Sequence, residues 1–381
     1  MSPSIKNKIY FPGLNGLRFI AAFAVVITHL ELMKNRLGIE NYWKHPFVHE
    51  LGGLGVSFFF VLSGFLITYL LLVESKSQGY FSVKNFYIRR IYRIWPLYFL
   101  IFIIGFFIIP NIPFFKISFF SSSFQNNYWE NFILYFLMFP NLAFSIYSPV
   151  PLIGQAWSIG VEEQFYLFWP LFIRKLKKVS VKFLIITLLV IILVKSFALI
   201  VYSFYETKLF EVIKNFLAMA KFENMVIGAF GALFIINKKN RILNFIYKPL
   251  ILLLAILGIA CLTFINNSIL RDGMHIVNAI FFLIIILNVS SNKSSFIKFE
   301  NKGFNFLGKI SYGIYMYHFI IVYIVLKLLS TYGFLENITI LMNVFIYFLT
   351  TILTLIISYL SYEFFEKYFL SLKSKHSYFS T

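Results

Sequence analysis

LRFIAAFAVVITHL, residues Leu17–Leu30, is apolar enough to enter a lipid bilayer, yet it carries Arg18 near its start and His29 near its end. An ionisable side chain at the centre of a bilayer costs about 2.5 kcal/mol or more, so such residues usually face a protein interior or a water-filled cavity. On a helix that turns about 100° per residue, positions eleven apart return to nearly the same face. The stretch therefore predicts a membrane helix with one polar stripe that faces other helices.

The composition places the whole chain in the membrane class. Of its 381 residues, 60% are hydrophobic and 13% are charged, whereas a soluble domain is about half apolar and a quarter charged. Apolar runs continue from Leu17 to Leu360, which predicts an all-α polytopic helix bundle in the lipid bilayer. We expect no cleavable signal peptide, because the first run lacks a small-residue cleavage site. Cys261 is the only cysteine, which excludes an intramolecular disulfide.

The formal charge of +19 can indicate a nucleic-acid partner or a membrane orientation. Here the basic residues lie in short loops between apolar runs, which is typical of orientation in a membrane and of attraction to anionic head groups or phosphates. We therefore expect no nucleic-acid partner.

Candidate helices follow the apolar runs, and a full crossing needs about 17–25 residues. They are Gly16–Met33, Gly55–Val73, Ile94–Ile109, Phe132–Phe144, Trp157–Ile173, Phe183–Tyr205, Phe216–Ile236, Pro249–Ile265, His275–Val289, Ile310–Leu329 and Ile338–Tyr362. Basic clusters before Ile94 and after Ile173 are both expected on the cytoplasmic side, so the chain returns only once between them. We expect Phe132–Phe144, which is short and followed by prolines, to be re-entrant or interfacial. This predicts about ten transmembrane helices with both termini cytoplasmic.

The domain organisation is expected to be simple. The outer loops are too short for a separate globular domain, and no internal repeat is clear. We expect one membrane domain over residues 1–370, and a polar cytoplasmic tail with a frayed end over residues 371–381.

Arg18 and His29 lie about 16 Å apart along the helix axis at 1.5 Å per residue. Two interpretations stay open. In the first, Arg18 extends to the inner head groups and His29 hydrogen-bonds a neighbouring backbone. In the second, the two form a polar track with a cation near the cytoplasm and an imidazole at depth, where imidazole suits general-base catalysis near neutral pH.

The segment WSIGVEEQFYLFWP, Trp157–Pro170, brings two adjacent acids into an apolar run. Helical spacing puts Ser158, Glu162 and Tyr166 on one face and Glu163 about 100° away. We expect one acid to face the bundle and the other an entry vestibule. The alternative for each is a structural role as a neutral, hydrogen-bonded acid.

The segment GVSFFFVLSGFLI, Gly55–Ile67, carries a Ser63–Gly64 step inside a phenylalanine-rich helix. A small-residue step of this kind predicts close packing of two helices. We do not expect Ser63 to be a nucleophile, because the strand–turn–helix context of a G-x-S-x-G motif is missing.

The segment FYIRRIYRIWPLYF, Phe86–Phe99, places Arg90 and Arg93 on one helical face at the expected cytoplasmic border. They serve either as orientation charges or as ligands of a phosphorylated, adenine-bearing molecule. The second interpretation rests on the ability of arginine to bind phosphate bidentately and to stack on rings.

The segment FLGKISYGIYMYHFI, Phe306–Ile320, puts Ser311, Tyr315 and His318 on one face. His318 is interpreted first as a hydrogen-bonded core histidine and second as a pocket lining. No metal site is expected, because the i, i+4 histidines of HPFVHE lack the H-E-x-x-H pattern. Histidine with scattered arginines and acids is typical of group transfer rather than redox chemistry.

Taken together, these stretches resemble the acyltransferase type 3 family of polytopic bacterial membrane proteins, which includes O-antigen and capsule O-acetylases. The resemblance covers Leu14–Phe369. It rests on six stretches in the family's order: GLRFIAAFAVVITH, GVSFFFVLSGFLI, FYIRRIYRIWPLY, QAWSIGVEEQFYLFWP, FLGKISYGIYMYHF and SYLSYEFFEK. It implies a protein of the inner (cytoplasmic) membrane that takes an acyl group from cytoplasmic acyl-CoA, usually acetyl-CoA. The implied acceptor is a sugar hydroxyl of a lipid-linked or cell-surface glycan, and no metal takes part.

The resemblance also implies roles for individual residues. The family's Arg-x10-His signature corresponds to Arg18 and His29, its W-S-x-x-x-E acid to Glu162, and its R-x-x-R motif to Arg90 and Arg93. We therefore expect His29 to be catalytic, Glu162 to be catalytic by orienting the imidazole and stabilising its charged form, and the three arginines to bind the donor. The expected substrate pocket comprises Trp157, Ser158, Glu163, Tyr315 and His318.

The chain departs from the family pattern at three places. Ser57 stands where an Asp is frequent, Tyr368 replaces a Pro, and Lys221 with Glu223 replaces an Arg and an Asp. The resemblance is to members without a fused esterase-like domain, so a separate chain is expected to complete any later modification.

A transporter or flippase of glycan lipids is the rival function. Arg18, His29 and Glu162 inside a bundle would also suit a proton-coupled path. The lack of clear repeat symmetry and the family resemblance favour the acyltransferase.

Overall fold

The computed structural model describes residues 9–115, 124–147, 149–175, 179–265, 268–335 and 339–376, apart from the side chains of 268–272. No β-strand occurs within these ranges. The helices, in chain order, are α1 (Leu14–Arg36), α2 (Pro46–Gln78), α3 (Val83–Ile103), α5 (Tyr128–Phe136), α6 (Pro140–Ile146), α7 (Trp157–Lys175), α8 (Val181–Tyr205), α9 (Lys208–Met219), α10 (Phe222–Ile236), α11 (Asn240–Ile246), α12 (Pro249–Leu262), α13 (Ser268–Ser291), α14 (Lys302–Lys309), α15 (Ser311–Thr331), α16 (Ile340–Ser361) and α17 (Lys367–Lys375). The short helical segments are η1 (Ile104–Ile108), η2 (Ile109–Asn111), η3 (Pro113–Phe115), η4 (Gly154–Ala156) and η5 (Tyr362–Glu366).

The predicted all-α, multi-pass membrane bundle is confirmed. In the described part of the chain, eight helical stretches are long and apolar enough to cross a membrane, or nine if α11 and α12, bent by 60°, form one broken span. α7 is not among them, because Glu162, Glu163 and the basic residues at its end lower its apolar character. The total of ten crossings and the cytoplasmic position of the termini stay predictions.

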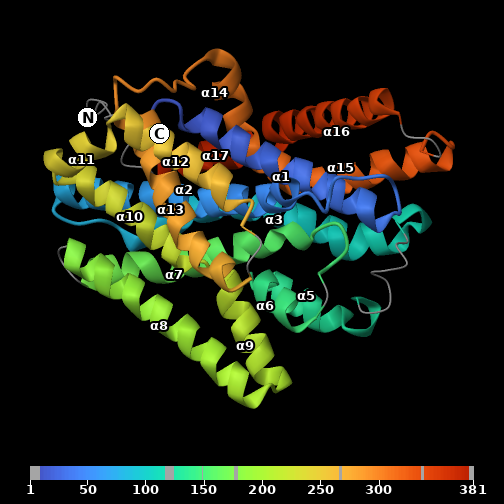
Figure 1. Cartoon of the computed structure of the whole chain (residues 1–381), viewed down its shortest axis with the longest axis horizontal. Coiled ribbons are helices and arrows are strands. Elements are labelled where there is room, and N and C mark those ends of the chain that lie inside the picture. Colours follow the sequence, from blue (N-terminus) through green and yellow to red (C-terminus); the bar gives the residue numbers. More distant parts are fainter. Residues whose placement is uncertain are drawn as a thin grey trace.

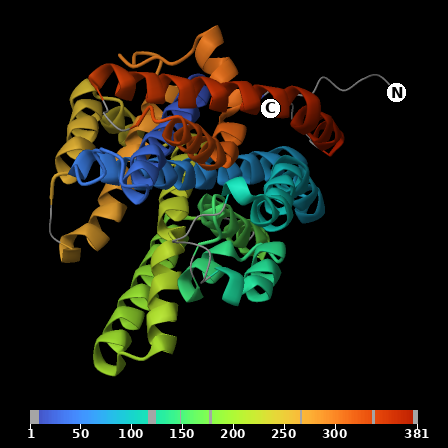
Figure 2. The same cartoon turned by 90° about the vertical axis from the view of Figure 1, so that its right-hand side faces the viewer.

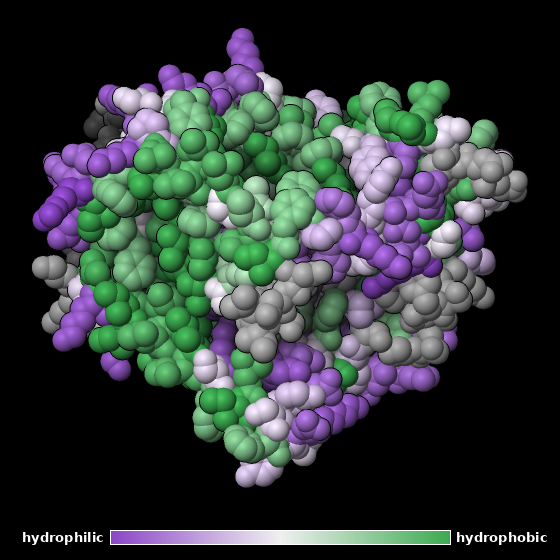
Figure 3. All heavy atoms as spheres, viewed as in Figure 1, coloured by the Kyte–Doolittle hydropathy of each residue, from purple (hydrophilic) through white to green (hydrophobic). Residues whose placement is uncertain are grey.

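The centre of the bundle is formed by α2, which contacts α1 on one side and α10 on another, and by α15, which packs against α1 (Figure 1). α8 and α9 form a hairpin that projects from this body, as Figure 2 shows in green. On the face seen in Figure 3, a broad apolar surface covers the region of α12 and α13, where Leu250, Leu254 and Leu257 of α12 are exposed. Such a surface is what a lipid-facing helix presents.

The segment expected to be re-entrant or interfacial forms two short helices. α5 has nine residues and α6 has seven, whereas a crossing needs about 20. The chain turns between them at Met138, whose φ of 65° is in the left-handed region. Phe132–Phe144 is therefore not a single spanning helix.

Glycines allow α2 and α10 to approach backbone to backbone. A Cβ at Gly64 would lie 1.9 Å from the carbonyl oxygen of Met225, and one at Gly228 would lie 2.0 Å from that of Val61. The Ser63–Gly64 step is therefore a helix-packing site, as its small residues predicted.

Two sets of contacts fix the ends of α1. At its start, Gly13 N–H donates to Glu300 Oε2 at 2.7 Å. Burial opposes ionisation of this carboxyl, but hydrogen bonds from Tyr10, Asn305 and the Gly13 N–H outweigh it, so the pKa of Glu300 lies below its ordinary value. The loop before α14 therefore holds the first turn of α1 through a carboxylate.

At the other end of α1, Lys34 and Glu31 form an ion pair of 2.7 Å whose side chains are both 0% exposed. Lys34 Nζ also donates to Asn343 Oδ1 at 2.8 Å, and Tyr347 OH donates to Glu31 Oε1 at 2.8 Å. Asn343 and Tyr347 both belong to α16. A buried ion pair is stable only when further hydrogen bonds satisfy it, so this group ties α1 to α16.

The polar end of the chain differs from the expectation of a frayed tail from residue 371. α17 continues to Lys375, and Arg89 Nη1 of α3 donates to the carbonyl oxygen of His376 at 3.0 Å. This contact with α3 keeps the polar segment helical past the expected boundary. Residues 377–381 lie outside the described ranges.

We predict that Gly228→Ala destabilises the protein by at least about 1–3 kcal/mol, because the new methyl group forces α2 and α10 apart. The matched control is Gly53→Ala in α2, where a Cβ would meet nothing within 4 Å. Thermal unfolding of the purified variants in detergent measures the difference. Equal melting temperatures for the two variants would contradict the close approach.

We predict that Lys34→Met lowers the free energy of unfolding by about 3–5 kcal/mol, because it leaves the Glu31 carboxylate buried without its cation. The control is Lys367→Met, which breaks an exposed pair with Glu363 and should leave the melting curve unchanged. If both variants melt together with the wild type, the Glu31–Lys34 pair does not anchor α1.

Candidate functional site

The two histidines singled out in the sequence lie against each other. His29 of α1 and His318 of α15 have their Nδ1 and Nε2 atoms 2.6 Å apart, and their rings are nearly parallel at 4°. His318 is completely buried, whereas His29 keeps some exposed surface. This pairing could not be predicted from local sequence, because 289 positions separate the two residues.

The surroundings of His318 fix the tautomer of both rings. His318 Nδ1 lies 3.2 Å from the carbonyl oxygen of Ile314, which can only accept a hydrogen bond. His318 therefore carries its proton on Nδ1 and accepts at Nε2 when neutral. His29 must donate from Nδ1, so its Nε2 keeps a lone pair that can take a proton or attack a carbonyl carbon.

A group of hydroxyls adjoins the histidine pair. Tyr315 OH donates to the carbonyl oxygen of Gln155 at 3.0 Å and lies 2.6 Å from Ser158 Oγ. The Tyr315 and His318 rings have centroids 5.9 Å apart. Ser158 and Tyr315, both expected in a substrate pocket, are thus brought together beside the histidines. Gln155, which the sequence analysis missed, supports them through its backbone and its side chain, whose Nε2 donates to the carbonyl oxygen of Met316 at 2.8 Å.

Trp157 lies at the start of α7, next to Ser158. Its ring meets Phe60 of α2 edge to face, with centroids 6.2 Å apart. This contact packs the first turn of α7 against α2 and holds Ser158 in place. A direct role of Trp157 in a substrate pocket stays a prediction.

Glu162 belongs to a different polar group from His29. Tyr166 OH donates to Glu162 Oε2 at 2.6 Å, and Ser63 Oγ lies 2.5 Å from the same hydroxyl. The charged groups that act on Glu162 are Arg18, Arg90 and Arg93. The titratable groups that act on His29 are His318 and Arg36. The partner of His29 Nδ1 is thus His318 rather than Glu162, and a role of Glu162 in orienting the imidazole stays a prediction.

Glu163 points away from Glu162, as the 100° offset predicted. Its Oε2 accepts a hydrogen bond of 3.0 Å from Trp95 Nε1 of α3, and its Oε1 is buried without a hydrogen-bond partner. The two adjacent acids therefore have different surroundings. Glu163 lies between α7 and α3 rather than beside Ser158 and Tyr315.

The three arginines assigned to the donor come together at the other end of the polar stripe. Arg18 Nη1 donates to Asn15 Oδ1 at 2.8 Å, and Arg18 interacts electrostatically with both Arg90 and Arg93. Arg93 is exposed, whereas Arg18 and Arg90 are partly buried. Three guanidinium groups so close together repel one another unless anions lie between them.

Arg90 is held by aromatic rings rather than by hydrogen bonds through its Nε. The guanidinium carbon lies 5.5 Å from the ring centroids of both Phe86 and Tyr166. Its Nε is buried and has no hydrogen-bond partner. Stacking of this kind leaves the donors of the guanidinium available to a phosphate.

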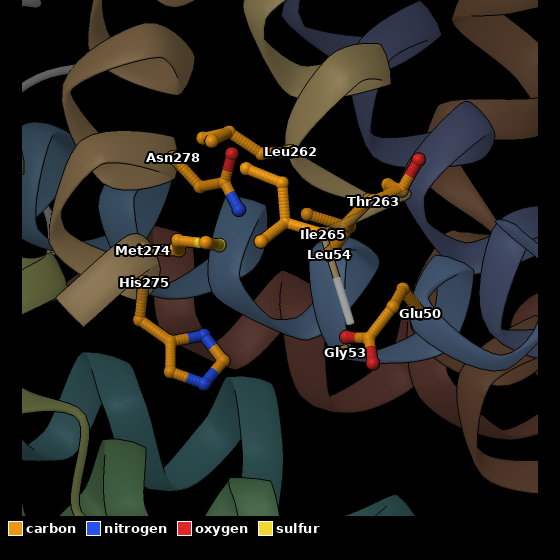
Figure 4. Close-up of a pocket in the computed structure, with 9 residues that line it drawn as sticks. All are labelled: Glu50, Gly53, Leu54, Leu262, Thr263, Ile265, Met274, His275 and Asn278. Atoms are coloured by element: carbon orange, nitrogen blue, oxygen red, sulfur yellow. The ribbon is translucent and has the colours of Figure 1, made fainter. Parts of the chain in front are cut away.

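A small hollow, partly open to solvent, lies elsewhere in the molecule. Figure 4 shows its lining from α2, α12 and α13, with Glu50, His275 and Asn278 among the polar residues. It lies on the side of α2 opposite to Gly52 and Gly55, which contact α1. The hollow is therefore separate from the histidine pair and from the arginines. Among the described residues, no group of three or more His, Cys, Asp or Glu side chains is arranged to hold a metal ion.

Comparisons with known proteins identify the family of this chain. A family model described as an acyltransferase domain matches residues 11–363. A Staphylococcus aureus protein provisionally named an O-acetyltransferase is 29% identical over 382 residues, which cover 95% of this chain and 57% of the relative. Peptidoglycan O-acetyltransferase OatA of Listeria monocytogenes is 28% identical over 341 residues, covering 83% of this chain and 50% of the relative. No solved structure matches the chain.

A third relative points the same way. YrhL of Bacillus subtilis, provisionally named a peptidoglycan O-acetyltransferase, is 34% identical over 172 residues, which cover 43% of this chain and 24% of the relative. This chain spans about half the length of the first curated relatives it matches.

Proposed function

The chain belongs to the acyltransferase family whose model matches residues 11–363, and from that premise we propose that it moves an acetyl group from acetyl-coenzyme A to a hydroxyl of a cell-envelope glycan. Membership makes it an O-acyltransferase, and its helices make it a multi-pass membrane protein. The donor, the acceptor and the location in the cytoplasmic membrane are parts of the proposal. The observation that carries it is the 2.6 Å contact of His29 with His318, which leaves His29 Nε2 as a base.

In the proposed reaction, His29 Nε2 takes the proton of the acceptor hydroxyl while its oxygen attacks the thioester carbonyl. The new C–O bond forms, the C–S bond breaks, and the departing thiolate receives the proton from His29. An acyl group carried briefly on His29 Nε2 is the second possible route, and both routes need the same lone pair. His318 orients the imidazole and stabilises its charged form. We assign Ser158 and Tyr315, which contact each other beside the ring of His318, to the lining of the acceptor pocket.

The arginines at the other end of the stripe suit the phosphates of the donor. Arg18 and His29 are about 16 Å apart along α1, and an extended pantetheine arm spans about 20 Å by the reach of an extended chain. Phosphates near Arg18, Arg90 and Arg93 would therefore allow the thioester to reach His29. Glu162, which lies among these arginines, positions them in the proposed mechanism.

The acceptor is proposed from the names of the relatives. Two of them are named for peptidoglycan O-acetylation, whereas the sequence resemblance pointed to O-antigen, capsule and lipopolysaccharide. We therefore favour a cell-wall glycan as the acceptor. The chain spans only part of the length of these relatives. The acceptor of a full-length relative is therefore assigned to this chain only as part of the proposal.

A transporter or flippase for glycan lipids is disfavoured by the family membership. Membranes that contain the protein, given radiolabelled acetyl-coenzyme A and glycan, distinguish the two functions. Label in the glycan supports acyl transfer, and movement of glycan lipid without label supports transport.

We predict that His29→Ala lowers the rate of acetyl transfer at least 10²–10⁴-fold, the range that a general base supplies. His318→Ala should lower kcat by a smaller factor with little change in KM, because His29 keeps its lone pair but loses its orientation. His49→Ala, at an exposed histidine, is the control and should keep full activity. A well-inserted His29→Ala protein with normal activity would refute the proposed chemistry.

We predict that Arg90→Gln with Arg93→Gln raises the KM for acetyl-coenzyme A by about tenfold or more, because each charged hydrogen bond contributes about 1.5–3 kcal/mol. Arg241→Gln, at an exposed arginine of α11, should leave KM unchanged. Steady-state kinetics with reconstituted protein provides the comparison. An unaltered KM in the double variant would mean that these two arginines do not bind the donor and serve only as charges that orient the protein in the membrane.

A further inference from the structure

The last described helix lies over the arginine group. His376, which follows α17, accepts a hydrogen bond at its carbonyl oxygen from Arg89 Nη1 and places its ring 6.1 Å from that of Tyr92, at 25°. Arg89 and Tyr92 belong to the same segment of α3 as Arg90 and Arg93. α17 is thus fixed on the helix that carries the R-x-x-R motif, although a polar tail was expected from residue 371 onward.

This position brings another cation to the group. Lys373 of α17 is partly buried and lies one helical turn before His376, whose backbone N–H donates to the Lys373 carbonyl oxygen at 3.1 Å. It therefore lies near the segment of α3 that contacts His376 through Arg89 and Tyr92, and it interacts electrostatically with the arginines of the group. Cations from three helices, α1, α3 and α17, therefore converge although they are far apart in the sequence. Each added like charge makes this arrangement more costly in the absence of an anion.

Carboxylates lower this cost only in part. Glu74 pairs with Arg89 at 3.0 Å, and Glu162 acts on the arginines from α7. Glu163 acts on Arg90 and Glu366 acts on Arg93. The buried and unpartnered Nε of Arg90 is a further donor in the group that no carboxylate takes up.

We propose that Lys373 of α17 completes the binding site for the nucleotide end of the donor and takes the phosphate that lies farthest from the thioester. The inference rests on the proposed function, because it assumes a coenzyme A donor. Arg18 is on the stripe that leads to His29, so it suits the diphosphate next to the pantetheine arm. Lys373 comes from the helix that covers the group from outside the stripe, so it meets the 3′-phosphate on the ribose.

The proposal explains why α17 is held on α3. A lysine on a mobile tail would lose side-chain and backbone freedom on binding the phosphate. The bond from Arg89 and the contact between Tyr92 and His376 fix the helix beforehand. Lys373 therefore binds at a lower entropic cost than an unanchored lysine would.

The test compares two nucleotides that differ in the 3′-phosphate. Purified full chain in nanodiscs of neutral lipid is titrated by calorimetry with adenosine 3′,5′-bisphosphate and with adenosine 5′-monophosphate, which lacks only the 3′-phosphate. Lys373→Gln should weaken binding of adenosine 3′,5′-bisphosphate by about 10-fold or more, the loss of one charged hydrogen bond, and leave binding of adenosine 5′-monophosphate within about threefold. The matched control is Lys375→Gln, at an exposed lysine of the same helix, which should bind both nucleotides as the wild type does.

The outcomes separate this inference from the proposed function. If Lys373→Gln binds adenosine 3′,5′-bisphosphate like the wild type, or if the wild type does not bind it, the inference is overturned. Acetyl transfer that still depends on acetyl-coenzyme A and on His29 would then leave the proposed function standing. If the phosphate belongs to an anionic lipid instead, Lys373→Gln reduces retention of phosphatidylglycerol and leaves nucleotide binding unchanged, which also overturns the inference.

Discussion

The hydrogen bond between His29 and His318 is the interaction on which the candidate site depends. Polar atoms inside a helix bundle must find partners within the protein, because lipid offers none. The carbonyl of Ile314 fixes one histidine, and that histidine fixes the other. The contacts of α1 with Glu300 at its start and with α16 at its end hold this geometry in register.

A second constraint is the separation of the basic nitrogen from the cations. The arginines and Lys373 lie at one end of the stripe on α1, and the histidine pair lies at the other, about 16 Å away by the rise of the helix. The face of α7 that carries Ser158, Glu162 and Tyr166 connects the two ends, since Ser158 contacts Tyr315 and Glu162 acts on the arginines. The positive charge therefore gathers at one end of the stripe, away from the imidazole that we propose as the base.

Several features followed from local sequence. The apolar runs predicted an all-α membrane bundle, and the Ser63–Gly64 step predicted the close contact that Gly64 makes with α10. The i, i+4 spacing placed Ser158 and Glu162 on one face. The contact of His29 with His318, by contrast, was not expected, because no local rule reports which distant helix lies against α1. The frayed tail expected from residue 371 proved to contain part of α17 for the same reason.

By itself, the sequence determined the helices, their apolar faces and the residue types available for acyl transfer. These properties depend on hydrophobicity and on the helical period, which act over a few turns. Only the tertiary structure decided which polar groups meet. In the tertiary structure, His29 contacts His318, and Glu162 and Lys373 both interact electrostatically with the arginines. These contacts depend on how helices far apart in the chain cross. The crossing geometry is set by the packing of the whole bundle.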